Sequence, residues 1–233
     1  MNTMQDVTIS YDDMLKAGMH FGRKKTVFNP KMGPYVYTVR DGICIIDLLK
    51  TQAQLTNITE FLKKTIQGGG LVLFVGITKQ SSGGIKELAE KLGQPYVIDR
   101  WIGGSLTNFK IINDRVKKLE EMEKADKAGQ YDKYTKKERL MLNREMAKMS
   151  TRFEGLKKLT RMPDVVFVSS LKESALPIHE AKKQGVKVVA ITNTDSNPNS
   201  VNYIVPANDR SKRSVDLILE ALGSELSTAT TNQ

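Results

Sequence analysis

The chain has 233 residues, which is enough for one large domain, or one domain with an appendage, and for a hydrophobic core without a disulfide or metal. Its formal net charge of +10 favours phosphate-rich partners. The one cysteine, Cys44, excludes an internal disulfide and fits a reducing compartment. No apolar stretch approaches the roughly 18 residues of a membrane helix. Residues 1–10 resemble neither a signal nor a transit peptide. We therefore expect a soluble, cytoplasmic protein without a membrane partner.

A β-hairpin and a long helix are the first elements that the sequence predicts. Residues 36–40 and 43–47 are apolar and β-branched, and Asp41-Gly42 between them is typical of a tight hairpin turn. Residues 48–67 have a helical pattern that Gly68 ends.

Strands and helices alternate in the rest of the chain, apart from one central segment. The expected strands are 71–75, 96–98, 165–168, 186–191 and 203–205, and the expected helices are 81–92, 175–184 and 209–222. Continuous apolar strands of this kind are buried on both faces. The pattern predicts the α/β class, with a doubly wound, mostly parallel sheet of flavodoxin-like or Rossmann-like type. The small polar residues 224–233 predict a disordered tail.

The central segment, residues 107–161, has a different period and most of the charge. Apolar residues recur there at heptad spacing in two runs, 109–122 and 142–156, and Thr135 with Glu138 fits a capping box that opens the second run. The segment holds 16 Lys and Arg against 9 Asp and Glu, which gives +7 of the total +10. We predict an antiparallel coiled-coil hairpin inserted into a discontinuous α/β domain, residues 1–106 and 162–223.

The cations on the outer faces of this hairpin have two compatible interpretations. Charges beside a heptad seam are most often a solvated surface. Lys and Arg also displace counterions from phosphates, so a basic hairpin is suited to hold an RNA backbone. The candidates are Lys110, Arg115, Lys117, Lys118, Arg139, Arg144, Lys148, Arg152, Lys157, Lys158 and Arg161.

Catalytic and metal-binding patterns are absent from the sequence. Two histidines and one cysteine supply no zinc spacing, and Cys44 lies in an apolar run typical of a buried residue. Residues 76–84 match neither phosphate-binding glycine motif, although the start of a helix can bind an anion. Residues 192–199 lie at an edge where α/β folds bind ligands, or form an ordinary turn. We expect no catalytic residue, metal or cofactor. A sugar-phosphate or nucleotide enzyme that uses these two loops is the alternative.

Two further segments differ from simple loops. Residues 18–35 form a predicted basic N-terminal loop with cations and aromatic rings, a mixture suited to RNA backbone and bases. Its candidate RNA ligands are His20, Arg23, Lys24, Lys25, Asn29 and Lys31. Residues 99–110 contain the only tryptophan, Trp101, which we interpret as a packing residue where the hairpin leaves the sheet, with Gly103 and Gly104 allowing a sharp turn.

These segments together resemble the ribosomal protein S2 family of the small subunit, bacterial or organellar type, from about Ser10 to Leu222. The resemblance is carried by Leu15-Lys16-Ala17-Gly18-Met19-His20-Phe21-Gly22, Asn29-Pro30-Lys31-Met32, Asp41-Gly42-Ile43-Cys44-Ile45-Ile46-Asp47-Leu48, Phe74-Val75-Gly76 with Lys79-Gln80, Arg100-Trp101-Ile102-Gly103-Gly104 with Leu106-Thr107-Asn108-Phe109, and Ile204-Val205-Pro206 with Asn208-Asp209. Arg23 and Phe28 stand where the family commonly has His and Trp, which keeps cationic or aromatic character.

The resemblance implies a scaffold role without a catalytic step. The expected position is the head–body junction of the small ribosomal subunit, in contact with its rRNA and with neighbouring proteins, including ribosomal protein S1, and not as a homo-oligomer. Lys79, Arg100 and Asn108 join the candidate rRNA ligands on this basis. The expected location is the cytoplasmic ribosome, with an organellar ribosome as the alternative. A free RNA-binding regulator that uses the same basic hairpin is the second alternative.

Overall fold

A small antiparallel sheet forms the N-terminal end of the molecule. In the computed structural model, which describes residues 9–230 and the side chains of residues 9–227, three strands follow a short helix. The bounds are α1 Tyr11–Lys16, β1 Phe21–Lys24, β2 Val36–Arg40 and β3 Ile43–Ile46, and the strand order is β1-β3-β2. Asp41 and Gly42 both have positive φ, 50° and 75°, which is the geometry of a two-residue hairpin turn. The predicted β-hairpin is confirmed.

The prediction that residues 18–35 form a loop is wrong. This segment contains β1 and two short 3-10 helices, η1 Lys25–Val27 and η2 Pro30–Tyr35. The sequence of β1 has little strand propensity, because Gly, Arg and Lys are not enriched in strands. Its strand conformation comes from antiparallel pairing with β3, in which Phe21 lies opposite Ile45 and Lys24 lies opposite Ile43. That tertiary contact is not visible in the local sequence.

The main sheet has five parallel strands. They are β4 Val72–Val75, β5 Tyr96–Val97, β6 Val165–Val168, β7 Lys187–Thr192 and β8 Tyr203–Pro206, in the order β5-β4-β6-β7-β8. Numbered from β4, this is the order 2-1-3-4-5 of flavodoxin-like folds. The predicted doubly wound parallel sheet is therefore confirmed.

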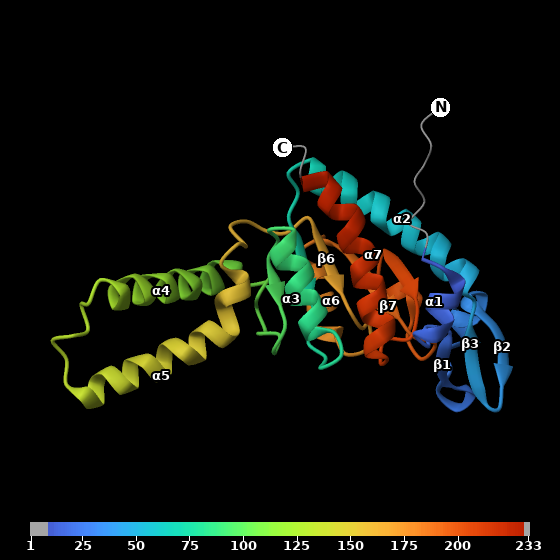
Figure 1. Cartoon of the computed structure of the whole chain (residues 1–233), viewed down its shortest axis with the longest axis horizontal. Coiled ribbons are helices and arrows are strands. Elements are labelled where there is room, and N and C mark those ends of the chain that lie inside the picture. The colour runs from blue at the N-terminus through green and yellow to red at the C-terminus, as the bar shows by residue number, and fades with distance from the viewer. Residues whose placement is uncertain (1–8, 231–233) are drawn as a thin grey trace.

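Helices cover both faces of this sheet (Figure 1). One face packs against α2 Leu48–Gln67, α3 Ser82–Lys91 and α7 Lys212–Thr230, and the other packs against α6 Ala175–Lys183 and the base of the helical hairpin. Strand residues alternate between the two cores: Phe74 and Phe167 belong to the first, Leu73 and Val166 to the second. This period of two explains why each strand reads as a continuous apolar run.

The predicted disordered tail is wrong for most of its length. Helix α7 continues to Thr230, and Leu226 is fully buried in the first core. Leu226 lies one helical turn after Leu222, so it extends the same apolar stripe although its neighbours are small and polar. The predicted tail residues 231–233 lie outside the described residues.

The inserted segment forms two antiparallel helices that project from the sheet (Figure 1). They are α4 Phe109–Lys127 and α5 Lys136–Phe153, followed by η3 Glu154–Leu156. Thr135 and Glu138 form the predicted capping box. At the base, Ile112, Val116 and Phe153 are buried in the second core. We call residues 107–161 the arm. Its base is fixed to the sheet, and its far end stands free.

The N-terminal sheet is attached to the main sheet through Gly22. A Cβ atom at this position would lie 2.7 Å from the Cys44 carbonyl oxygen and 2.7 Å from the Thr194 Cγ2 atom. We expect Gly22→Ala to lower the free energy of unfolding by about 1–3 kcal/mol, because a well-packed site must shift to admit the methyl group. Urea denaturation measures the change.

Gly33→Ala is the matched control for this substitution. A Cβ atom at Gly33 meets nothing within 4 Å, so we expect a change within about 0.5 kcal/mol. Equal effects of the two substitutions would contradict the close approach at Gly22.

Candidate RNA-binding interface

The surface of the arm is rich in solvent-exposed cations. Lys110, Lys117 and Lys118 are exposed on α4, and Arg144 and Lys148 are exposed on α5. The seam between the helices is apolar and buried along α4, where Leu119 is fully covered. The predicted separation of a structural seam from charged outer faces therefore holds for this part of the chain.

Some arm cations hold the two helices and their loop together. Lys118 pairs with Glu145 across the helices at 3.0 Å, and Lys157 pairs with Glu123 at 2.8 Å. Arg139 pairs with Asp132 in the loop region at 3.2 Å. Exposed pairs of this kind contribute at most about 1 kcal/mol each, but they occupy the cation. Among the described residues, Lys117, Arg144 and Lys148 have no ion-pair partner, which makes them the stronger candidates for phosphate.

A basic groove lies where the arm meets the sheet. Arg100, Lys86 and Arg152 line it together with Asp99 and Glu154, and its volume is about 390 Å³. Arg100 was a predicted RNA ligand, and Arg152 belonged to the predicted outer face. Lys86 was missed, because a lysine on an ordinary amphipathic helix carries no sequence signal of its neighbours. Asn108 is exposed just before α4, and Lys79 is exposed after β4.

The predicted N-terminal RNA ligands divide into two groups. Lys24 is exposed at the end of β1, and Lys25 and Lys31 are exposed in the 3-10 helices η1 and η2. Arg23 instead turns inward to Asp195, with 3.4 Å between Nε and Oδ2, and the Asn29 side chain accepts a hydrogen bond from the Lys31 backbone N–H. These cations lie at the opposite end of the molecule from the arm (Figure 1).

His20 is a poor candidate for a phosphate ligand. Burial lowers the pKa of its imidazole below the usual 6.5, so the ring is neutral at physiological pH. Its ring centroid lies 4.0 Å from that of Phe21. The ring is half-buried and contributes packing rather than charge.

The joint between arm and sheet is organised by a buried carboxylate, Glu180 of α6. Glu180 Oε1 accepts hydrogen bonds from Trp101 Nε1 at 3.0 Å and from the Gly104 N–H at 2.8 Å. Its Oε2 accepts from the N–H groups of Leu106 at 3.0 Å and Thr107 at 3.2 Å. Trp101, which we interpreted as a packing residue at this joint, is buried in the second core. Glu180 was missed, because nothing in the sequence separates it from the solvated acids on other helices.

The pKa of Glu180 lies below its usual value of 4.5. Burial alone would raise it, but the hydrogen bonds from Trp101, Leu106, Gly104 and Thr107 stabilise the charged form and outweigh burial. A lowered folded-state pKa gives stability that is present above the unfolded pKa and is lost as the pH falls through the folded value.

We therefore expect the stability advantage of the wild-type chain over Glu180→Gln to be constant from neutral pH to about pH 5. It should shrink below about pH 4, because the wild-type carboxylate then takes up a proton and the glutamine does not. Urea unfolding at several pH values measures this. A difference that grows on acidification would contradict the assignment.

At the carboxyl ends of the parallel strands, where α/β folds commonly bind ligands, the N-terminal segment of the chain occupies part of the space. Thr194, in the loop after β7, accepts a hydrogen bond from the Arg23 N–H at 2.8 Å through its hydroxyl. Its carbonyl accepts from the Asn29 N–H at 2.9 Å. Asn208, after β8, donates through Nδ2 to the Gly18 carbonyl at 3.1 Å. The 192–199 loop therefore holds the N-terminal sheet, which is a structural role.

The hydroxyl groups of the loop after β4 also form their hydrogen bonds within the chain. Ser81 Oγ lies 2.7 Å from Ser169 Oγ and 2.8 Å from Thr78 Oγ1. Nearby, Asp209 accepts hydrogen bonds from Ser170 at 2.7 Å and Asn193 at 3.0 Å. Buried hydroxyl and amide groups that bond to one another leave few donors aimed at a phosphate ligand.

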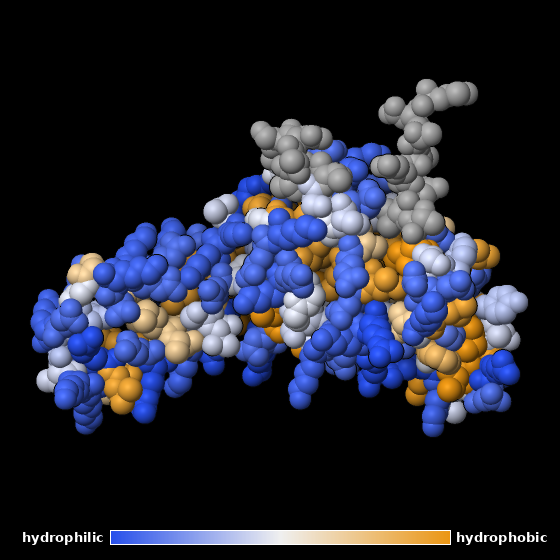
Figure 2. Space-filling model, viewed as in Figure 1, coloured by the Kyte–Doolittle hydropathy of each residue, from blue (hydrophilic) through white to orange (hydrophobic). Residues whose placement is uncertain are grey.

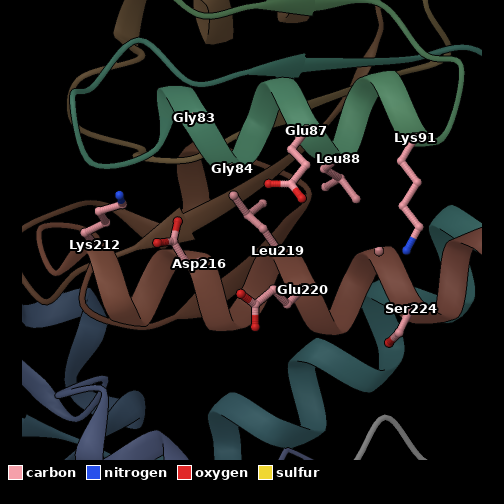
Figure 3. A pocket seen from close by; sticks show the side chains of 11 residues that line it. Gly83, Gly84, Glu87, Leu88, Lys91, Lys212, Asp216, Leu219, Glu220 and Ser224 are labelled. Atoms are coloured by element: carbon pink, nitrogen blue, oxygen red, sulfur yellow. The ribbon is translucent and has the colours of Figure 1, made fainter.

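A groove of about 480 Å³ is lined by α3 and α7, and it has no catalytic arrangement. Figure 3 shows Glu87 pointing from α3 toward α7 and Asp216 pointing from α7 toward α3. Burial raises the pKa of Asp216, with Lys212 lowering it and Glu87 raising it further. The other polar lining residues are Lys91, Lys212, Glu220 and Ser224. No residue of this set pairs a nucleophile with a base.

Cys44 is buried, and burial raises the pKa of its thiol above the usual value, although Thr194 and Lys25 act in the opposite direction. A thiol of this kind is inert. Within the described residues, no group of three or more His, Cys, Asp or Glu has the arrangement of a metal site. The same part of the chain has no helix long and apolar enough to span a bilayer.

Comparison with known proteins decides the family. The model of the family described as ribosomal protein S2 matches residues 14–229. The protein named small ribosomal subunit protein uS2 of Parabacteroides distasonis is 39% identical over 214 residues, which cover 92% of this chain and 77% of that protein. The chain belongs to the ribosomal protein S2 family. The uS2 protein of Thermus thermophilus is 41% identical, covering 91% of this chain and 83% of that protein. That of Fusobacterium nucleatum is 40% identical, covering 94% and 89%.

Membership of the ribosomal protein S2 family makes the chain a structural, non-enzymatic component of the ribosome. Family membership therefore excludes the alternative of a sugar-phosphate or nucleotide enzyme. This agrees with the two loops considered for ligand binding, 76–84 and 192–199, whose polar groups form hydrogen bonds within the chain. The arm cations are then candidate rRNA ligands of a ribosomal scaffold protein.

Proposed function

We propose that this protein is a structural constituent of the small ribosomal subunit in the cytoplasm, where it supports translation by holding rRNA and protein neighbours together without forming a homo-oligomer. The names of its relatives, small ribosomal subunit protein uS2, support this directly. The observation that carries the rRNA part is the projecting arm, which has +7 of the +10 net charge.

The arm supplies the phosphate contacts in this proposal. Its base is fixed in the second core, so exposed cations such as Lys117, Arg144 and Lys148 are presented on rigid helices. Lysine and arginine side chains that neutralise phosphates release counterions from the RNA, which favours binding. The groove with Arg100 and Arg152 extends this basic surface to the sheet.

The opposite end supplies protein contacts in this proposal. On the small sheet, Phe21 is 46% exposed, Tyr37 is 76% exposed and Val39 is 43% exposed. Exposed aromatic and apolar side chains are typical of protein-binding surfaces. The proposed neighbours include ribosomal protein S1. A molecule with rRNA ligands along its arm, and with a protein-binding surface beside Lys24, Lys25 and Lys31 at its other end, suits the head–body junction.

Sedimentation of a lysate through a gradient tests this function. We expect a tagged full-length chain to appear in the small-subunit fraction at low salt. A chain found only in the free-protein or small-RNA fractions would contradict the proposal and would favour the free RNA-binding regulator.

A further inference from the structure

The free end of the arm has an apolar recess of about 660 Å³ between its loop and α5. Tyr131 and Tyr134 come from the loop, and Met141 and Leu142 come from α5. The two tyrosine rings are 6.0 Å apart at 57°. Tyr134 is 42% exposed and Met141 is 61% exposed. Figure 2 shows apolar side chains set among hydrophilic ones near this end of the arm. Large exposed aromatic and apolar groups so far from the core have no structural function that the fold requires.

The charge around the recess is positive, because the cations without an ion-pair partner outnumber Glu138, the one lining acid without a cationic partner. Asp132 pairs with Arg139 at 3.2 Å, and Glu145 pairs with Lys118 at 3.0 Å. Glu138 accepts hydrogen bonds from the N–H and the hydroxyl of Thr135 in the capping box. Arg144 and Lys148 line the recess and Lys133 lies against Tyr134, and none of these three described cations has an ion-pair partner.

We propose that this recess binds an unpaired RNA base, which stacks on Tyr131 and Tyr134 while the surrounding cations hold the adjoining phosphates. The site rests on the proposed function and narrows it, since it assigns the end of the arm to a single-stranded loop or bulge rather than to a duplex. Bases that are not paired can leave their own stack and lie on tyrosine rings. Inside a duplex the bases are stacked on one another and cannot stack on a tyrosine ring, so a duplex would be bound by cations alone.

Charge favours RNA over a protein occupant. A protein partner of this recess would have to place acids against the three unpaired cations Lys133, Arg144 and Lys148, in addition to burying its own apolar residues. A nucleotide presents a flat apolar face and a phosphate within the same unit, which matches tyrosines next to lysines and arginines. Lys133 also lies over the Tyr134 ring, with Nζ 5.8 Å from the centroid. A cation at this distance from a stacking ring is within reach of a phosphate on a stacked nucleotide.

The test uses the full chain with two RNAs, a duplex and the same duplex closed by an unpaired adenine loop. One variant is Tyr131→Leu with Tyr134→Leu, which keeps apolar side chains at both positions but removes the stacking rings. The matched control is Tyr131→Phe with Tyr134→Phe, which keeps the rings. We expect the leucine variant to lose about tenfold or more in affinity for the looped RNA and nothing for the duplex. The phenylalanine variant should keep most of the affinity.

A second readout reports stacking itself. A fluorescent adenine analogue in the loop should be quenched by the wild-type chain and by the phenylalanine variant, but not by the leucine variant. Equal loss on both RNAs, or no loss on either, would overturn the base site. Loss of a protein neighbour from assembled subunits, with RNA affinity unchanged, would overturn it in favour of a protein occupant.

Failure of the base site can be distinguished from failure of the proposed rRNA contacts of the arm. Stacking is not electrostatic, so the leucine variant should keep the wild-type salt dependence. If reversing the arm cations left this dependence unchanged while the leucine variant still lost quenching, the phosphate contacts would be wrong and the base site would stand.

Discussion

Glu180→Leu lowers the free energy of unfolding by about 3–5 kcal/mol, the largest effect that we expect from one substitution in this chain. Glu180 is 4% exposed, and its carboxylate accepts hydrogen bonds from Trp101, Gly104, Leu106 and Thr107. Leucine has a similar size but no acceptor, so these N–H groups lose their partner at the joint. Each donor left without a partner in a buried site costs about 1–3 kcal/mol, and part of this cost is relieved by local movement.

Urea denaturation followed by circular dichroism measures the loss in the free energy of unfolding. Tryptophan emission shows whether the change lies at the joint. Trp101 is the only tryptophan, and its indole N–H binds Glu180, so its emission in the folded variant should change. Glu173→Leu is the control, because Glu173 is about half exposed and pairs with Arg210 at 3.7 Å. We expect less than about 1 kcal/mol there. A Glu180 variant as stable as the control would show that the hydrogen bonds do not hold the joint.

Reversal of three arm cations, Lys117→Glu, Arg144→Glu and Lys148→Glu, should weaken rRNA binding and flatten its salt dependence. These side chains are exposed and have no ion-pair partner among the described residues. Removing one bound phosphate lowers the log–log salt slope by about 0.7–0.9, so removing three lowers it by roughly 2–3. Titration of small-subunit rRNA at several salt concentrations measures both quantities.

The matched control makes the same change in net charge away from the arm. Lys182, Lys183 and Lys187 are exposed at the end of α6 and the start of β7. Reversing these three lysines should lower the affinity for rRNA, because the net charge of the protein falls, but the log–log salt slope should stay close to that of the wild-type chain. An arm variant with the wild-type slope would mean that its cations are only solvated. Lys118 is left out of the set, because it pairs with Glu145.

The main features of the fold could be predicted because they have a strong local signal. The apolar run 165–168 matches β6, and the helical pattern 48–67 matches α2, residue for residue. The capping box at Thr135 was read from two side chains three residues apart. Each of these signals arises from neighbours in sequence, where periodicity and capping rules apply.

The features that could not be predicted depend on partners far along the chain. Strand β1 exists because it pairs with β3, and Leu226 is helical because it completes an apolar stripe in the core. At the candidate interface, only the structure shows that Arg23 turns inward to Asp195 and that Lys118 is occupied by Glu145. A set of exposed cations can be proposed from sequence, but which of them are unpaired cannot. Glu180 was missed for the same reason.

The insertion point of the arm affects how the sheet can form. Strands β4 and β6 are adjacent in the sheet, yet Leu71 and Asp164 at their start are 93 positions apart in sequence. Closing so long a loop costs entropy that grows slowly with length, by about 0.6 kcal/mol for each doubling. The contacts between α4 and α5 are local, and helical hairpins of this kind form quickly. Once the arm has formed, its antiparallel helices draw residues 109 and 153 together, and the loop that remains to be closed is much shorter. The same segment that we propose for RNA binding thus lowers the entropic barrier to folding of the domain that carries it.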